Sequence, residues 1–320
     1  MKLGVFTVLF GVKQLEEALD LAQSQGLQAV EIGTGGYVGK SHIAPAELLQ
    51  DQQAISRIIR MTGERGLTIS ALSCHGNPLH PNQEQALADH KDFQDTVRLA
   101  AALGVNTVIT FSGCPGDSEH SLYPSWVTCP WPPDFLHVLE WQWTNKVIPY
   151  WKEQSEFCKQ YGVRVAIEAH PGFVVYNTET ALRLREATGD NIGVNFDPSH
   201  LFWQGMDPVE CIKALGSAIF HVHAKDTHID PRNTAINGVL DVKPYSDELN
   251  RSWIFRTIGY GADVKVWKSI VSTLQKVGYD GVISIEHEDS LMSVNEGYTK
   301  AARFLNDILI REKAGEMWWA

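Results

Sequence analysis

A repeated pattern of amphipathic and apolar stretches organises this chain. In seven places a stretch with apolar residues three and four positions apart ends at a glycine, and a short apolar, β-branched run follows directly. Glycine commonly ends helices, and such short runs are typical of buried strands. Strands are therefore predicted within residues 24–33, 64–73, 102–111, 160–169, 188–197, 214–223 and 276–286, and the apolar opening at 2–10 supplies an eighth.

Helices are predicted between and after these strands, at residues 15–25, 48–65, 87–103, 139–160, 178–188, 207–215, 266–277 and 296–310. Each has one apolar face, as expected of a helix that packs on a sheet. Strict alternation of strands and helices implies parallel strands, and eight such units fit a closed barrel. We predict an α/β fold, a single-domain (β/α)8 TIM barrel over residues 1–320. An open doubly wound sheet is disfavoured because no G-x-G-x-x-G follows the first strand.

Composition and charge exclude several classes of partner. The formal charge is −11 and no run of Lys or Arg occurs, which argues against binding to nucleic acid. No apolar stretch reaches the roughly 18 residues of a membrane span. The apolar run after Lys2 resembles a short signal peptide, but no small-residue cleavage site follows it. Five separated cysteines without a C-x-x-C pair indicate reduced thiols in the cytoplasm, and a homo-oligomer is left open.

Two connections are too long for simple turns, and both follow strands, on the side where a barrel builds its active site. They span residues 114–137 and 227–262 and contain many Trp, Tyr, Pro and Arg residues. We predict that both are ordered active-site lids. The second is expected to present Trp253 and Arg256 to the pocket, with Gly259 and Gly261 as hinges.

Acidic and imidazole side chains stand at the carboxyl ends of the last four predicted strands. The sequences there are Glu168-Ala169-His170, Asp197-Pro198-Ser199-His200, His221-Val222-His223 followed by Lys225 and Asp226, and Glu286-His287-Glu288-Asp289. Because the carboxyl ends of barrel strands meet at one rim, these groups are predicted to lie close together. Burying so many ionisable groups is costly without a compensating cation. Carboxylate and imidazole ligands without thiolate favour Mn²⁺, Mg²⁺, Co²⁺ or Fe²⁺ over a structural zinc.

Four segments, VAIEAHPG, NFDPSHL, HVHAKD and ISIEHED, resemble the metal-site segments of the xylose isomerase-like barrel superfamily. That group includes ketose 3-epimerases, hydroxypyruvate isomerases, inosose dehydratases and sugar phosphate isomerase/epimerase proteins, and the resemblance covers essentially the whole chain. It implies one divalent ion, Mn²⁺ before Mg²⁺, Co²⁺, Fe²⁺ or Zn²⁺, held by Glu168, Asp197, His223 and Glu286. It also implies that Glu168 and Glu286 are the acid/base groups and that His200 contacts the substrate.

Other residues near the rim are candidates for contact with the substrate: His170, His75, Asn77, Trp253 and Arg256. Lys225 is expected either to join them or to pair with Asp226 or Glu286. We expect His221, on the strand of His223, to point away from the barrel lumen and to be structural.

The chain departs from the ketose 3-epimerases directly after the seventh strand. Those enzymes place a substrate-binding Arg shortly after the metal-binding His, whereas Thr227, His228 and Ile229 stand here. Arg232 or Arg256 is the candidate replacement.

The predicted activity is metal-dependent isomerisation or epimerisation of a small-molecule sugar. A carboxylate would remove the proton α to a carbonyl while a metal-stabilised ene-diolate forms. The alternative is a lyase or deglycosidase that eliminates the aglycone from a 3-keto glycoside at the same metal site, since the long aromatic segments suit a bulkier substrate. Endonuclease IV-like cleavage needs a further His after the fourth strand, where the chain reads Thr110-Phe111-Ser112-Gly113. A non-catalytic sugar-binding module would be expected to lose ligands, and all four are present.

Overall fold

The computed structural model describes residues 1–312 and 315–320. Eight parallel strands close into a barrel in the order β1-β10-β7-β6-β5-β4-β3-β2, which confirms the predicted (β/α)8 fold. The barrel strands are β1 (Lys2–Phe6), β2 (Ala29–Gly36), β3 (Thr68–His75), β4 (Thr107–Phe111), β5 (Arg164–Glu168), β6 (Ile192–Phe196), β7 (Ile219–Ala224) and β10 (Val282–Ile285). Each of them overlaps one of the predicted strand regions.

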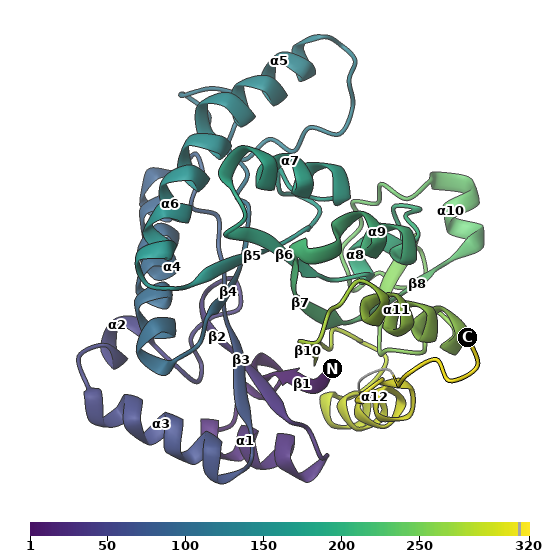
Figure 1. Ribbon diagram of the computed structural model, residues 1–320. Helices are drawn as coiled ribbons and strands as arrows, with labels where there is room; N and C mark the ends of the chain where they lie inside the picture. The colour runs from purple at the N-terminus through teal and green to yellow at the C-terminus, as the bar shows by residue number, and fades with distance from the viewer. Residues whose placement is uncertain (313–314) are drawn as a thin grey trace.

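Helices surround the barrel (Figure 1). The longer ones are α1 (Leu15–Ser24), α3 (Gln52–Glu64), α4 (Gln83–Leu103), α6 (Ile148–Gln160), α7 (Thr178–Thr188), α9 (Pro208–Leu215), α11 (Val264–Lys276) and α12 (Val294–Ile308). Shorter ones are α2 (Pro45–Leu48), α5 (Asp134–Trp141), α8 (Ser199–Phe202) and α10 (Pro231–Asn237). Two 3₁₀ turns, η1 (Thr7–Phe10) and η3 (Gly216–Ala218), and a π-helical turn, η2 (Gln142–Val147), complete the helical elements of the described residues.

Helix boundaries follow local hydrogen bonding that the sequence pattern marks only in part. The helix predicted over 48–65 begins later, at Gln52 as α3, because the Asp51 side chain accepts hydrogen bonds from the backbone N–H groups of Gln53 and Ala54. Leu48 is instead the last residue of α2. Helix α4 ends at Gly104, whose φ of +72° is the left-handed conformation that favours glycine. The first strand stops at Phe6, and the apolar residues after it form η1.

The core lies between the helices and the strands, and β4 and β6 are buried along their whole length. Two tryptophans on helices, Trp151 and Trp267, are fully buried there. Each indole N–H has a partner, since Trp151 donates to the Ser112 carbonyl at 2.8 Å and Trp267 donates to Asp226 Oδ2 at 3.1 Å. Full burial of one large apolar side chain contributes about 1.5–3 kcal/mol. These residues therefore fix the helices against the barrel at little polar cost.

The two long connections differ in structure. Within 227–262, β8 (Asp226–Ile229) and β9 (Trp253–Arg256) form an antiparallel pair, with α10 between them. The Asp226 carboxylate accepts hydrogen bonds from the backbone N–H groups of Gly259, Gly261 and Ala262, which ties the end of this insertion to its start, at the first residue of β8. The other connection leads into α5, which projects from the end of the barrel in Figure 1 and continues through η2 into α6.

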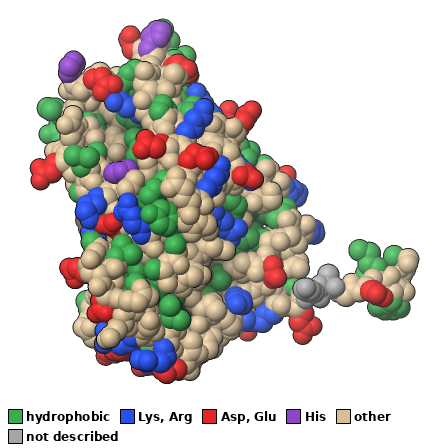
Figure 2. Space-filling view, turned by 60° about the vertical axis from the view of Figure 1, so that its left-hand side comes forward, with side chains coloured by type: hydrophobic (Ala, Val, Ile, Leu, Met, Phe, Trp, Pro, Cys, Tyr) green, Lys and Arg blue, Asp and Glu red, His purple; other side chains and the backbone are tan. Residues whose placement is uncertain are grey.

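Among the described residues, every helix is too short or too polar to cross a membrane. On the face shown in Figure 2, Lys and Arg side chains lie among Asp and Glu side chains.

We expect one of the five cysteines to react rapidly with a thiol reagent in the native protein at pH 8. Cys129 is exposed, whereas the other four are buried. Burial raises the pKa of Cys74, Cys114 and Cys158 to about 12, so these thiols are protonated and inaccessible at that pH. Counting labelled thiols by mass spectrometry before and after denaturation checks this. Rapid labelling of two or more sites in native protein would contradict the packing described above.

Candidate metal centre

The four predicted metal ligands meet at the carboxyl end of the barrel. Glu168 is the last residue of β5, Asp197 directly follows β6, His223 lies on β7 and Glu286 directly follows β10. One candidate ligand atom from each residue lies within 4.8 Å of the others. The side chains of Glu168, Asp197 and His223 are buried, and Glu286 is partly buried at the rim. The parallel strands thus bring together groups that are more than a hundred residues apart in sequence.

Unpaired atoms in this cluster fit a cation. Asp197 Oδ2, His223 Nδ1 and Glu286 Oε2 are buried without a hydrogen bond among the described residues. His223 Nδ1 lies 2.9 Å from Glu286 Oε2 and 3.3 Å from Glu168 Oε2. Buried polar atoms without partners are destabilising, and a divalent cation would satisfy all of them. Three carboxylates and one imidazole form a suitable donor set for such an ion.

Lys225 is a second positive group of this cluster. Its buried Nζ lies 3.1 Å from Asp197 Oδ2, 3.0 Å from Glu286 Oε2 and 3.2 Å from Glu288 Oε2. Burial lowers the pKa of the ammonium, but the carboxylates of Asp197 and Glu286 outweigh it and hold that pKa well above its usual value. Of the two predicted partners, Lys225 therefore pairs with Glu286 and not with Asp226.

Imidazoles and an amide hold Glu168 in its ionised form. Asn195 Nδ2 donates to Glu168 Oε2 at 2.8 Å, and His75 Nε2 lies 3.1 Å from the same oxygen. His200 Nε2 lies 3.3 Å from Glu168 Oε1. Burial raises the pKa of Glu168, but the charge of His223 and the contact with His200 outweigh it and keep the pKa well below its usual range. A carboxylate in this state can accept a proton.

His200 connects two of the candidate ligands. Besides Glu168, its Nε2 lies 3.2 Å from Asp197 Oδ2. Burial and the charge of Lys225 lower the pKa of His200, but the Asp197 and Glu168 carboxylates raise it to about 9. The His200 imidazole is therefore protonated at neutral pH and can donate a hydrogen bond.

A cavity of about 420 Å³ opens beside the cluster. Its lining residues are Tyr37, Val38, His75, Phe111, Glu168, His170, Phe173, Lys225, Glu286 and Glu288. Phe111 and Phe173 are stacked with ring centroids 4.3 Å apart and form an apolar part of the lining. A cavity of a few hundred cubic ångströms with one apolar side and several convergent polar groups is typical of small-molecule sites.

The structure brings three of the predicted substrate-contacting histidines to this place. His75 and His170 line the cavity, and the ring of His200 lies 4.1 Å from that of His170. Asn77, Trp253 and Arg256 are engaged elsewhere and do not line the cavity. Their contact with substrate stays a prediction, and the same holds for His200, which does not line the cavity either.

Each of these three residues has a structural partner instead. Asn77 Oδ1 accepts a hydrogen bond from the Cys114 backbone N–H at 2.9 Å. The Trp253 ring stacks on Trp203 with centroids 4.6 Å apart. Arg256 Nε pairs with Asp289 Oδ2 at 3.1 Å, which connects β9 to the segment after β10. The sequence pattern alone does not show which residues at the rim make structural contacts of this kind.

Segment 227–262 reaches the cluster through Phe255, which the sequence analysis did not single out. Lys225 Nζ lies 4.8 Å from the centroid of the Phe255 ring, and the His200 ring meets this ring edge-on at 5.4 Å. Residues 114–137 contribute nothing to the cavity lining, although the Trp126 ring contacts Tyr176. The insertion after β7 is therefore the one of the two that touches the cluster.

Glu31 and His221 form a buried layer directly below the cluster. His223 Nε2 lies 2.9 and 3.0 Å from the two carboxylate oxygens of Glu31. Burial raises the pKa of Glu31, but His223 outweighs it and lowers this pKa to about 2. His221 was expected to point toward the helices, and this was wrong, because residues two apart on a strand share a face. Its ring lies 5.8 Å from that of His223, inside the barrel.

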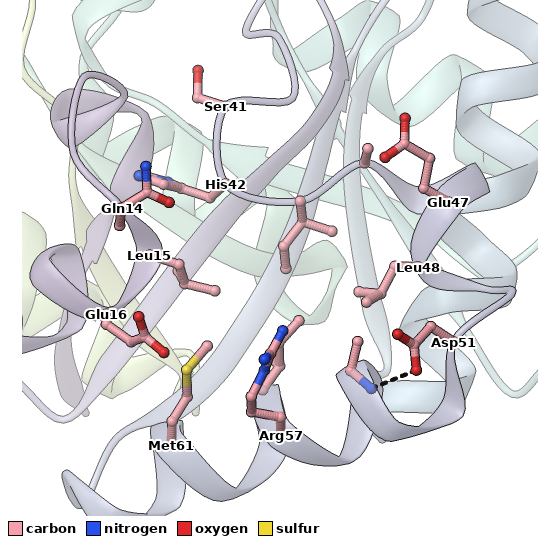
Figure 3. Close-up of a pocket in the computed structure, with 14 residues that line it drawn as sticks. Gln14, Leu15, Glu16, Ser41, His42, Glu47, Leu48, Asp51, Arg57 and Met61 are labelled. Atoms are coloured by element: carbon pink, nitrogen blue, oxygen red, sulfur yellow. Dashed lines mark hydrogen bonds between the residues drawn. The ribbon is translucent and has the colours of Figure 1, made fainter.

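A second cavity, of about 340 Å³, lies outside the barrel between α1 and α3 (Figure 3). It shares no lining residue with the cavity beside the cluster. His42 contributes an imidazole to the lining, and its two ring nitrogens have hydrogen-bond partners in Thr7 Oγ1 and the Phe10 carbonyl. The Asp51 carboxylate caps α3. These groups are committed to local structure, so the chemistry belongs to the cluster at the strand ends.

Comparison with known proteins agrees with this geometry. The family model described as xylose isomerase-like TIM barrel matches residues 19–308. The chain belongs to this family. The uncharacterized protein YfiH of Bacillus subtilis is 38% identical over 313 residues, which cover 97% of this chain and 99% of YfiH. An inosose dehydratase of Clostridium perfringens is 24% identical, and the match covers 70% of each protein.

A solved member of the same fold contains a metal. The IOLI protein with a bound zinc atom has a TM-score of 0.66 at 20% identity, over 97% of this chain and 98% of that chain. At this identity the likeness shows the fold alone. The xylose isomerase-like family contains sugar-processing enzymes, and this member carries candidate ligands for a divalent metal ion at the carboxyl ends of its strands.

Proposed function

We propose that this protein is a divalent-metal-dependent isomerase or epimerase of a sugar or sugar-derived polyol. The observation that carries the proposal is that two carboxylates, Glu168 and Glu286, line the same cavity and lie 3.3 and 2.9 Å from His223 Nδ1. Two such groups can remove a proton from one face of a carbon and return one on the other. The ion held by Glu168, Asp197, His223 and Glu286 would supply Lewis-acid stabilisation of the oxyanion that forms next to that carbon.

The chain's own residues would divide the remaining work. Glu168, which is ionised and lines the cavity, is the candidate base for the proton α to the carbonyl. Lys225 Nζ faces the cavity and would donate a hydrogen bond to a substrate oxygen that becomes negative. His75, His170 and His200 would bind hydroxyl groups. Phe111 and Phe173 would exclude water from the apolar side of the substrate.

Metal identity, lid movement and cellular location complete the proposal. Mn²⁺ is the ion we propose first, because carboxylate and imidazole ligands without a thiolate suit it. Residues 227–262 would close over the cavity through Phe255, and 114–137 would support them through Trp126, which packs near Trp253. We place the enzyme in the cytoplasm, where its five free cysteines would stay reduced.

A second candidate is elimination at the same site, as in a lyase acting on a 3-keto glycoside. It shares the first proton abstraction and differs in the loss of a β-substituent. The relative named inosose dehydratase supports it, since dehydration is a β-elimination. The apolar wall formed by Phe111 and Phe173 would also accept an aglycone. The residues that line the cavity would serve elimination and epimerisation equally.

An NMR assay in D₂O with Mn²⁺ distinguishes the two activities. We expect a member of a panel of keto-sugars to gain deuterium at the carbon next to its carbonyl and to form an epimer or isomer. Release of the aglycone from a 3-keto glycoside, without epimer formation from any keto-sugar, would favour the elimination. Absence of deuterium incorporation into both substrate classes would contradict proton abstraction at this site.

A further inference from the structure

Glu31 occupies a position that neither the proposed chemistry nor the ligand set uses. It lies in the middle of β2, fully buried inside the barrel, rather than at the strand's carboxyl end. Both of its carboxylate oxygens contact His223 Nε2, and Ser73 Oγ donates to Oε1 at 2.5 Å. A buried carboxylate without a function in the fold is costly. Its partner is the one imidazole among the four candidate metal ligands.

We propose that Glu31 is the positioning residue of the metal centre, which fixes the orientation and the tautomer of His223. Accepting the Nε2–H of His223 leaves the proton on Nε2 and the lone pair on Nδ1. Nδ1 is the ring atom that faces Glu168 and Glu286 at 3.3 and 2.9 Å. A carboxylate behind a metal-bound imidazole also makes that imidazole a stronger donor. This inference rests on the proposed metal centre.

The same buried layer also positions a second ligand. His221 Nδ1 lies 3.1 Å from Asn195 Oδ1, and Asn195 Nδ2 donates to Glu168 Oε2. His221 Nε2 in turn lies 3.1 Å from Ser70 Oγ and 3.9 Å from Glu31 Oε2. Two of the four ligands, His223 and Glu168, are therefore held from below by side chains that do not reach the cavity. Glu31 is the charged member of this layer.

A different occupant of the layer would be a second metal ion, held by Glu31, His221 and His223. Their candidate ligand atoms lie within 4.8 Å of one another. Such an ion would need His223 to lose both ring protons, because Nδ1 already faces the first ion. It would also displace the proton that joins His223 to Glu31, and none of the three residues lines a described cavity through which an ion could enter. Hydrogen bonding explains the short contacts without that additional ionisation.

The experiment measures binding of Mn²⁺ and Co²⁺ alone, so no substrate is needed. Titration calorimetry gives affinity and stoichiometry, and the absorption bands of bound Co²⁺ report its coordination. We expect one ion per wild-type chain. In Glu31→Gln the affinity should fall about 10- to 100-fold, and the Co²⁺ bands should shift, because a neutral amide accepts the Nε2–H more weakly and can instead donate an N–H to Nε2, so it no longer specifies the tautomer.

Two further variants separate this role from stability. Thr34→Val changes another fully buried polar side chain of β2, which bonds the Ser73 carbonyl and touches no ligand, so its metal affinity should match wild type. Glu31→Asp keeps the charge, so it should bind the metal ion more tightly than Glu31→Gln. The Asp variant also tests the inference if the Gln variant does not fold.

Wild-type affinity in both Glu31→Gln and Glu31→Asp would overturn the inference, and so would two ions in wild type and one in Glu31→Gln. A wild-type chain that binds no metal would refute the proposed centre as well. If the wild-type chain binds one metal ion with the expected dependence on Glu31 but acts on no sugar, the proposed function is refuted and the role of Glu31 is not.

Discussion

We expect Glu168→Gln and Glu286→Gln each to lose most turnover while still binding metal under excess Mn²⁺. Glutamine keeps the shape of the side chain and one ligating oxygen, but it cannot accept the substrate proton. Loss of a general base typically lowers a rate about 10²- to 10⁴-fold. Steady-state kinetics on the substrate found by the NMR assay, together with metal analysis of the same samples, measures both effects. Glu156→Gln, on the exposed face of α6, is the control and should be unchanged.

Isotope exchange separates the roles of the two carboxylates. If one removes the proton and the other returns it, one variant should still exchange the substrate α-proton with solvent deuterium while forming no product. Near-wild-type turnover in both variants with metal bound would mean that neither carboxylate is the base. His170, which lines the cavity, or His200 would then be the better candidate.

We expect Asp197→Ala and His223→Ala to lose the metal ion and to keep the fold. Both residues contribute to the cluster a buried atom that makes no hydrogen bond, and alanine would remove that candidate ligand atom. Metal content should be close to one ion per wild-type chain and should fall sharply in both variants. Binding at about 100 times Kd adds about 2.7 kcal/mol to the free energy of unfolding, so Mn²⁺ should raise the melting temperature of wild type and leave that of the variants unchanged.

The matched control is His42→Ala, which removes an imidazole from the cavity between α1 and α3 (Figure 3). It should keep the metal content and the Mn²⁺-dependent rise in melting temperature. Metal content in Asp197→Ala and His223→Ala equal to that of wild type would remove these two residues from the ligand set.

The barrel and its four candidate ligands follow from local features of the sequence. Seven of the eight barrel strands are marked by an apolar run after a glycine, and each candidate ligand stands at or directly after a strand end, as Glu168 and Glu286 do. Closure of parallel strands then brings those ends together, so their proximity needs no knowledge of side-chain packing. The boundaries at Asp51 and Phe6 depend on individual hydrogen bonds and turns, which periodicity does not report.

The contacts around the ligands depend on packing between distant segments. The pairing of β8 with β9 spans an insertion, and it decides that Phe255 faces Lys225 while Trp253 stacks on Trp203. Glu31 lies within an apolar strand, where the sequence offers one signal, a carboxylate at a position that should be buried. Its partner His223 is 192 residues away, so that signal could not identify what it binds.

Anomalous diffraction from crystals grown with Mn²⁺ tests the metal centre most directly. One strong peak per chain is expected, bounded by Glu168, Asp197, His223 and Glu286, with Glu31 behind His223 and outside the coordination sphere. A structure with no peak at these strand ends, or with its peak between Glu31 and His221, would contradict the account.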